Sequence, residues 1–151
     1  MAAARFSHLT QRPLEATLPM LIEKSLAAGW RVAVRGADAE RLDWLDARLW
    51  LEPEDGFLAH GRAGGPHDAD QPVLLTTGAA GNGAACLMAI DGAEVTAPEA
   101  AALERVCILF DGHDAAAVDH ARAQWSTLTA AGVPAQYWSE ESGRWQMKTE
   151  R

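Results

Sequence analysis

The chain has 151 residues, of which 48% are hydrophobic, and a formal net charge of −8. This length fits one domain, residues 1–151, around a sizeable core, and no apolar stretch approaches the roughly 20 residues that a membrane-spanning helix requires. The acidic balance argues against a basic surface for DNA or RNA, because binding phosphates requires clustered lysine and arginine.

Hydrophobic spacing in the first part of the chain predicts a strand, a helix and a second strand. A short strand at Phe6–Leu9 precedes a helix whose apolar residues recur at helical spacing as far as Leu26. Gly29 marks the end of that helix, because glycine is the usual residue just after a helix C-terminus. Residues 30–34 form the next expected strand.

A second helix and a long loop are expected next. Asp38 can cap a helix whose apolar positions are Leu42, Leu45 and Leu49. Residues 51–71 are rich in glycine and proline and predict a loop. Connections in compact domains are usually shorter, so the length of this loop itself indicates a functional role.

The rest of the chain continues the alternation. Strands are expected at 73–76, 84–90 and 105–110, with a glycine-rich hairpin turn at 78–83 and a helical segment at 98–103. A helix from about 114 to 130 ends at Gly132, and residues 133–138 and 145–148 are expected to pair as a terminal hairpin. Strands alternating with helices predict an α/β layered domain with a mainly parallel central sheet.

Some segments contain residue types found in catalytic or metal sites. Gly78–Gly83 has the composition of a phosphate-binding loop, but a strand follows it and no Gly-Lys-Ser/Thr is present. His113 and His120 lack the further ligands that a zinc site requires. His60 stands in no recognisable nucleophile motif, so a structural role is favoured. The sequence therefore predicts no catalytic residue, metal or cofactor.

Trp50 and Phe57 lie in or beside the long loop. Large apolar residues in a polar segment are what a protein–protein contact requires, although the same residues could simply cap the edge of the core.

Cys86 and Cys107 lie in apolar runs, where a buried thiol is the commonest state. With no signal peptide evident, a cytoplasmic protein is expected.

Segments along nearly the whole chain resemble the chi subunit of bacterial DNA polymerase III, an accessory protein of the clamp loader. These segments are Phe6–Leu9, Glu23–Gly29, Leu45–Trp50, Phe57–Gly61, Gln71–Leu75, Ala121–Trp125, Ala131–Gly132, Tyr137–Trp138 and Gly143–Trp145. The resemblance implies a Rossmann-like three-layer fold and a non-catalytic role in DNA replication. It also implies contact with the psi subunit, or an equivalent replication protein, through Leu49, Trp50 and Phe57.

The resemblance further implies a site for the acidic C-terminal tail of single-stranded DNA-binding protein (SSB), which ends in an apolar residue with a free carboxylate. Arg122 and Trp125 share one helix face and offer such a tail a cation and an aromatic surface. Tyr137 is expected to complete the pocket. Ser126 stands where the family usually has a lysine, and Lys148 or Arg144 is a substitute cation.

The charge distribution and one alternative bear on this interpretation. Residues 118–151 carry equal numbers of acidic and basic side chains, so the rest of the chain carries the whole −8 and a local electropositive site is expected only toward the C-terminal end. The rival hypothesis is a small α/β enzyme or nucleotide-binding protein with a phosphate ligand near Gly36 or Gly112, each just after a predicted strand. A chi-like protein that has lost SSB binding is a third possibility.

Overall fold

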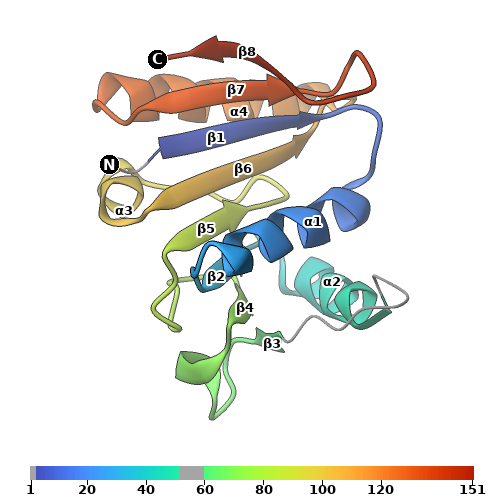
Figure 1. Ribbon diagram of the computed structural model, residues 1–151, viewed down its shortest axis with the longest axis vertical. Helices are drawn as coiled ribbons and strands as arrows, with labels where there is room; N and C mark the ends of the chain where they lie inside the picture. Colours follow the sequence, from blue (N-terminus) through green and yellow to red (C-terminus); the bar gives the residue numbers. More distant parts are fainter. Residues whose placement is uncertain (1–2, 52–59) are drawn as a thin grey trace.

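One mixed sheet runs the length of the molecule in the computed structural model, which describes residues 3–51 and 60–151 (Figure 1). Its eight strands lie in the order β3-β4-β2-β5-β6-β1-β7-β8. The strands are β1 (Ala3–Leu9), β2 (Val32–Arg35), β3 (Gly61–Arg62), β4 (Val73–Thr76), β5 (Cys86–Ala89), β6 (Arg105–Asp111), β7 (Ala135–Ser139) and β8 (Gln146–Glu150). All neighbours are parallel except β7 and β8, which form the predicted antiparallel hairpin.

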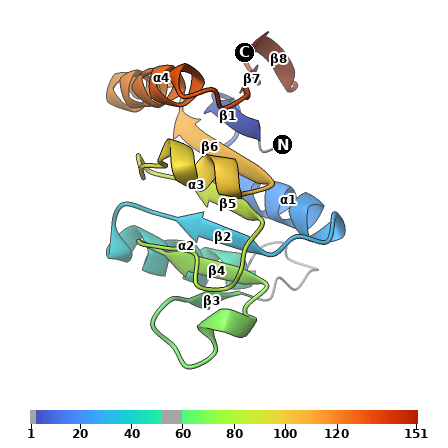
Figure 2. The same ribbon diagram turned by 90° about the vertical axis from the view of Figure 1, so that its left-hand side faces the viewer.

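Helices lie on both faces of the sheet, as the three-layer prediction requires. They are α1 (Leu14–Ala27), α2 (Ala39–Leu51), α3 (Ala97–Ala102) and α4 (Ala115–Ala130), with a short 3-10 segment, η1 (Asp68–Asp70). Figure 2 shows α1 and α4 on opposite sides of the sheet. Leu18, Ile22 and Leu45 belong to the core on the α1 and α2 side, whereas Phe6 and Leu128 belong to the core on the α4 side.

The helix ends follow from local residues. Gly29 and Gly132 both have a φ of +87°, the left-handed conformation that glycine adopts without a steric penalty. Asp114 caps α4 by accepting hydrogen bonds from the backbone N–H groups of Ala116 and Ala117. These helix termini agree with the helices expected from the sequence.

Two expectations are wrong. Residues 78–83 are not a hairpin turn, because β4 and β5 are parallel and lie on either side of β2. The connection instead returns from the carboxyl end of β4 to the amino end of β5 without forming a helix. Its Ala80 and Ala84 pack on the α4-side core. The expected loop at 51–71 contains β3 and η1 within its described part.

Candidate functional site

Trp125 on α4 and Tyr137 on β7 form one aromatic cluster. The Trp125 ring meets the Phe6 ring edge-on at 5.2 Å between centroids, and the Tyr137 ring at 6.2 Å. Both side chains are half-buried against the α4-side core. α4 contributes Trp125 because the helix packs on β6 and β7 with Ala121 and Leu128 inward. The structure therefore brings together two residues predicted for the SSB-tail site.

The Tyr137 hydroxyl is held by a residue that the sequence analysis did not single out. It is hydrogen-bonded to Nδ1 of His8 on β1, whose ring also packs against Phe110. A side chain at Gly112 would collide with the His8 ring, so this glycine is needed for close packing. Strand alternation was the available signal, because His8 lies two residues from the core residue Phe6 and therefore on the same face.

Arg122 supplies the cation next to this cluster. Its side chain is 76% exposed, and the nearest carboxylate oxygen, on the equally exposed Asp119, is 4.0 Å away. An ion pair of this kind on a surface is weak. Burial raises the pKa of the Tyr137 hydroxyl, while the positive charge of Arg122 acts in the opposite direction, so the two residues are electrostatically coupled. Arg122 is thus free to pair with an external carboxylate beside an aromatic surface.

Ser126 directly follows Trp125 in the chain, and Lys148 lies across the β7–β8 hairpin from Tyr137 and Trp138. Ser126 is exposed and lines a separate shallow hollow of about 380 Å³ with the chain after α4 and the C-terminal Arg151. The β7–β8 register shifts between Tyr137, which faces Thr149, and Trp138, which faces Met147. Lys148 is therefore the extra residue of a β-bulge on the exposed edge strand. No hydrogen bond or ion pair links either residue to Arg122, Trp125 or Tyr137 in the described chain.

The residues predicted for a second partner surface separate into a buried and an exposed part. Trp50 is 50% exposed at the end of α2, and its ring stacks on the buried ring of His60 at 4.2 Å. Leu49 is only 2% exposed and belongs to the α1-side core, so its side chain is not available for the direct partner contact that was expected. Phe57 lies outside the described residues.

His60 and Trp44 complete the description of α2. His60 is buried, and its Nε2 lies 2.9 Å from Oδ1 of Asp46, which ties the chain after the loop to α2. Trp44, which the sequence analysis passed over, is 37% exposed and lies under the guanidinium of Arg41 at 4.5 Å. The sequence could have predicted this exposure, because Trp44 does not lie on the helix face formed by Leu42, Leu45 and Leu49.

The rival nucleotide site was expected at the carboxyl ends of the strands, where the structure has a cleft of about 850 Å³. Neither expected glycine lines this cleft, and Gly36 instead lines a separate hollow of about 450 Å³ beside Arg35 and Glu99. Gly36 is backed by Leu42, whose Cδ2 would lie 2.9 Å from an added Cβ, and Gly112 is covered by His8. Most charged side chains lining the cleft are acidic: Glu15, Asp38, Asp91, Asp111 and Asp114. This lining is poorly suited to a phosphate.

Other candidate features are readily placed. Cys86 and Cys107 are both buried free thiols. Within residues 3–51 and 60–151, no group of three or more His, Cys, Asp or Glu side chains is arranged to hold a metal ion. No helix in the described part of the chain is both long enough and apolar enough to cross a membrane.

Comparison with models of known protein families gives a match. Residues 1–136 match the family model described as "DNA polymerase III chi subunit, HolC". The matched range includes Trp50, Arg122, Trp125 and Ser126, ends directly before Tyr137 and does not reach Lys148. A search of curated proteins finds no match.

Proposed function

The chain belongs to the DNA polymerase III chi subunit family, a family of replication accessory subunits, and from this premise we propose that it is a non-catalytic adaptor of the replisome. One surface, around Arg122 and Trp125, binds the acidic C-terminal tail of SSB. Another, around Trp50, binds psi or an equivalent protein of the clamp-loader complex. The protein acts in the cytoplasm and reaches DNA only through SSB.

The observation that carries the tail-binding proposal is the pairing of an exposed cation with an aromatic surface. Arg122 is 76% exposed and stands one helical turn before Trp125, whose ring packs against Phe6 and Tyr137. A peptide that carries carboxylates and ends in an apolar residue requires both features. Ser126 and Lys148 lie outside this pair, so Arg122 is the principal cation.

The second surface is supported by the exposure of Trp50. Tryptophan is enriched among residues that dominate binding energy, provided that a partner removes it from water. The ring of Trp50 rests on a buried His60, which in turn is held by Asp46, so its position is fixed before a partner arrives. Preorganisation of this kind lowers the entropic cost of binding.

The tail site is tested with a charge reversal and a matched control. Arg122→Glu should weaken binding of a peptide copying the organism's SSB tail by about tenfold or more, because a charge-assisted contact is replaced by repulsion. Lys24→Glu makes the same change of net charge at an exposed position on α1, on the other face of the sheet, and should bind like the wild type. Isothermal titration calorimetry measures both.

Equal affinity of the Arg122→Glu variant and the wild type would reject the site. Equal weakening by both variants would show that binding follows net charge rather than a local cation, which also contradicts the proposal.

The Trp50 surface has its own test. Trp50→Ala should weaken association with the reconstituted clamp-loader complex by about thirtyfold or more, the usual effect of losing a tryptophan that anchors an interface. Trp44→Ala removes an exposed tryptophan from another side of the same helix and serves as the control. A larger loss with Trp44→Ala than with Trp50→Ala would move the surface to the Trp44 side of α2.

A further inference from the structure

The face of the sheet opposite α4 is not fully covered by helices. In Figure 1, α1 lies over β2 and β5, whereas β1 and β7 face the viewer with no described helix in front of them. Side chains alternate along a strand, so Arg5 and Arg105 lie on the same face as Cys107, which belongs to the α1-side core. Trp138 lies on this face too, since it alternates with Tyr137 of the α4-side core. We refer to Arg5, Arg105, Trp30, Trp138 and Met147 as the open face.

Within residues 3–51 and 60–151, the two arginines of the open face form no ion pair with an acidic side chain. Arg5 lies over the ring of Trp138 at 5.7 Å, and Arg105 over the ring of Trp30 at 5.0 Å. Among the described residues, neither guanidinium forms an ion pair or a side-chain hydrogen bond, and Nε of Arg105 is buried without a partner. Burial and then the nearby charge of Arg105 lower the pKa of Arg5, so the two cations repel each other.

This juxtaposition contradicts the expectation of an electropositive site only toward the C-terminal end. Parallel pairing of β1 with β6 brings the two arginines together from distant parts of an acidic chain. Keeping two like charges side by side without a carboxylate costs stability. An anionic ligand would relieve that cost.

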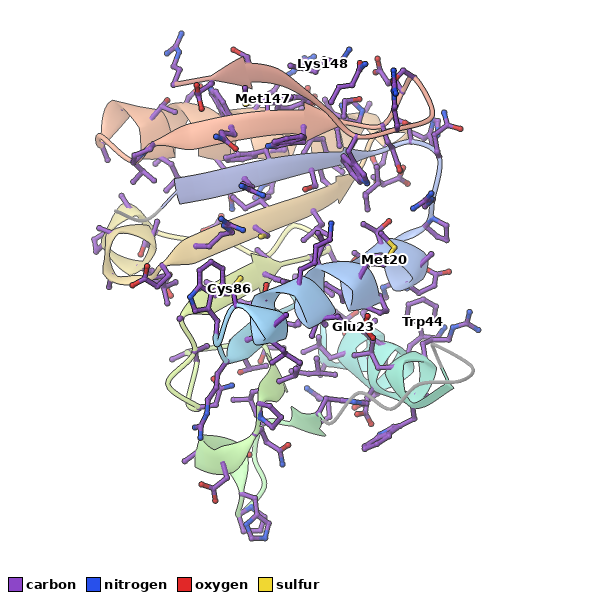
Figure 3. All side chains as sticks on the ribbon, in the orientation of Figure 1. Met20, Glu23, Trp44, Cys86, Met147 and Lys148 are labelled. Atoms are coloured by element: carbon purple, nitrogen blue, oxygen red, sulfur yellow. The ribbon has the colours of Figure 1, made fainter. Side chains whose placement is uncertain are left out.

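The open face also offers apolar surface. Trp30 and Trp138 are half-buried, and the indole N–H of Trp138 donates to Oε1 of Gln136 at 3.1 Å, which fixes the ring. Met147 on β8 faces Trp138 across the hairpin and is 46% exposed. Figure 3 shows Met147 on the hairpin at the edge of this face. A ligand that matches the open face therefore carries both negative charge and an apolar group.

We propose that the open face is a second docking surface, distinct from the Arg122 site, for a short acidic peptide segment with an aromatic or aliphatic residue. Its carboxylates would pair with Arg5 and Arg105, and its apolar side chain would pack on Trp138 and Met147. The protein carries a net charge of −8, which repels a long polyanion such as nucleic acid but tolerates a short segment that meets two local cations. This inference does not rest on the proposed SSB-tail site.

The probe for this surface is a fluorescein-labelled peptide of four aspartates and one phenylalanine with an amidated C-terminus. Blocking the terminus removes the free carboxylate that the Arg122 site is proposed to recognise. The full-length double variant Arg5→Gln, Arg105→Gln should bind this peptide at least about tenfold more weakly than the wild type in fluorescence anisotropy. Lys24→Gln, at an exposed position of α1, serves as the control and should bind normally.

A thermal melt separates loss of the site from loss of the fold. Because the variant relieves repulsion between the two cations but loses their contacts with the rings of Trp138 and Trp30, its Tm should stay close to that of the wild type while binding falls. No binding of the peptide to the wild type would overturn the proposal, and so would a loss of binding in Arg122→Gln but not in the double variant. If a short thymidine oligonucleotide binds instead of the peptide, with the same dependence on Arg5 and Arg105, the open face is a nucleic-acid surface and the peptide proposal is overturned.

Discussion

Glu140 determines how the end of β7 meets the start of α1. Its side chain is almost fully buried, and one carboxylate oxygen accepts hydrogen bonds from the backbone N–H groups of Thr10, Gln11 and Arg12 at 3.1, 3.0 and 3.0 Å. Backbone donors leaving a strand need partners, and a charged acceptor binds them more strongly than a neutral one. A single residue near the end of the chain thus orders the loop after the first strand.

Glu140→Gln should lower the free energy of unfolding by about 1–3 kcal/mol, because a neutral amide replaces a buried charged acceptor of three bonds. Urea denaturation at neutral pH measures the change. Glu141→Gln alters the neighbouring, exposed carboxylate and is the control, with an expected change within about 0.5 kcal/mol. Equal stability of Glu140→Gln and the wild type would contradict this role for Glu140.

We expect Tyr137 to contribute to the proposed tail site through its ring rather than its hydroxyl. Tyr137→Phe keeps the packing against Trp125 but leaves His8 without its hydrogen-bond partner. The free energy of unfolding should fall by about 1 kcal/mol, while affinity for the SSB tail should change less than twofold (about 0.4 kcal/mol). Tail binding that is lost together with the hydroxyl would show that the tail is recognised by the Tyr137–His8 pair instead.

At the scale of elements, α3 is held to the sheet by one ion pair. The Arg35 side chain on β2 is nearly buried, and its Nη2 lies 2.6 Å from Oε2 of Glu99 on α3. The same guanidinium donates to the backbone carbonyls of Gly78 and Glu94, so it also holds both connections that border β5. Glu99 completes a capping box with Thr96 at the start of α3.

This ion pair predicts a loss of stability in acid. The Arg35 guanidinium lowers the pKa of Glu99 from 4.5 to about 2, so Glu99 contributes stability above pH 4.5 and loses that contribution as the pH falls toward 2. Because its side chain is 36% exposed, the contribution is discounted for solvent screening to about 1–2 kcal/mol.

Glu99→Gln should therefore be less stable at neutral pH and lose less stability between pH 4.5 and 2 than the wild type. Thermal melts across that range measure both effects, with Glu104→Gln, an exposed neighbour, as the control. Parallel acid profiles of the wild type and Glu99→Gln would contradict this account of the Arg35–Glu99 pair.

The elements differ in how far the sequence predicts them. Helix ends depend on nearby residues, so Gly29, Gly132 and Asp38 could be interpreted directly. The path from β4 to β5 depends on which strands pair at a distance, and here β2 lies between the two. A glycine-rich segment between two strands is compatible with either a hairpin or a crossover, which explains the wrong prediction for 78–83.

At the scale of the whole molecule, charge and topology separate the surfaces for which different roles are proposed. The family and the α/β layered sheet were predicted from residues spread along the sequence. Arg122 and Trp125 could be paired because helical spacing is local. The proximity of Arg5 and Arg105, the burial of Leu49 and the bulge at Lys148 depend on strand register and packing, which short-range patterns do not contain.

The proposed tail site and the proposed Trp50 surface belong to different sheet faces. Trp125 and Tyr137 pack on the α4-side core, whereas Trp50 ends α2, whose leucines enter the α1-side core. Two such contacts can be made at once, and linking them raises the effective concentration of each partner for the other. Modest affinity at each surface then suffices for an adaptor.

The most direct test is a titration of the full-length protein with a fluorescent peptide copying its own organism's SSB C-terminal tail, at low and high salt. We expect a Kd on the order of micromolar or weaker at low salt, a weaker Kd at high salt, and loss of binding when the terminal apolar residue is removed. No binding at peptide concentrations of hundreds of micromolar (about 5 kcal/mol), or binding that survives removal of the terminal residue, would contradict the adaptor proposal.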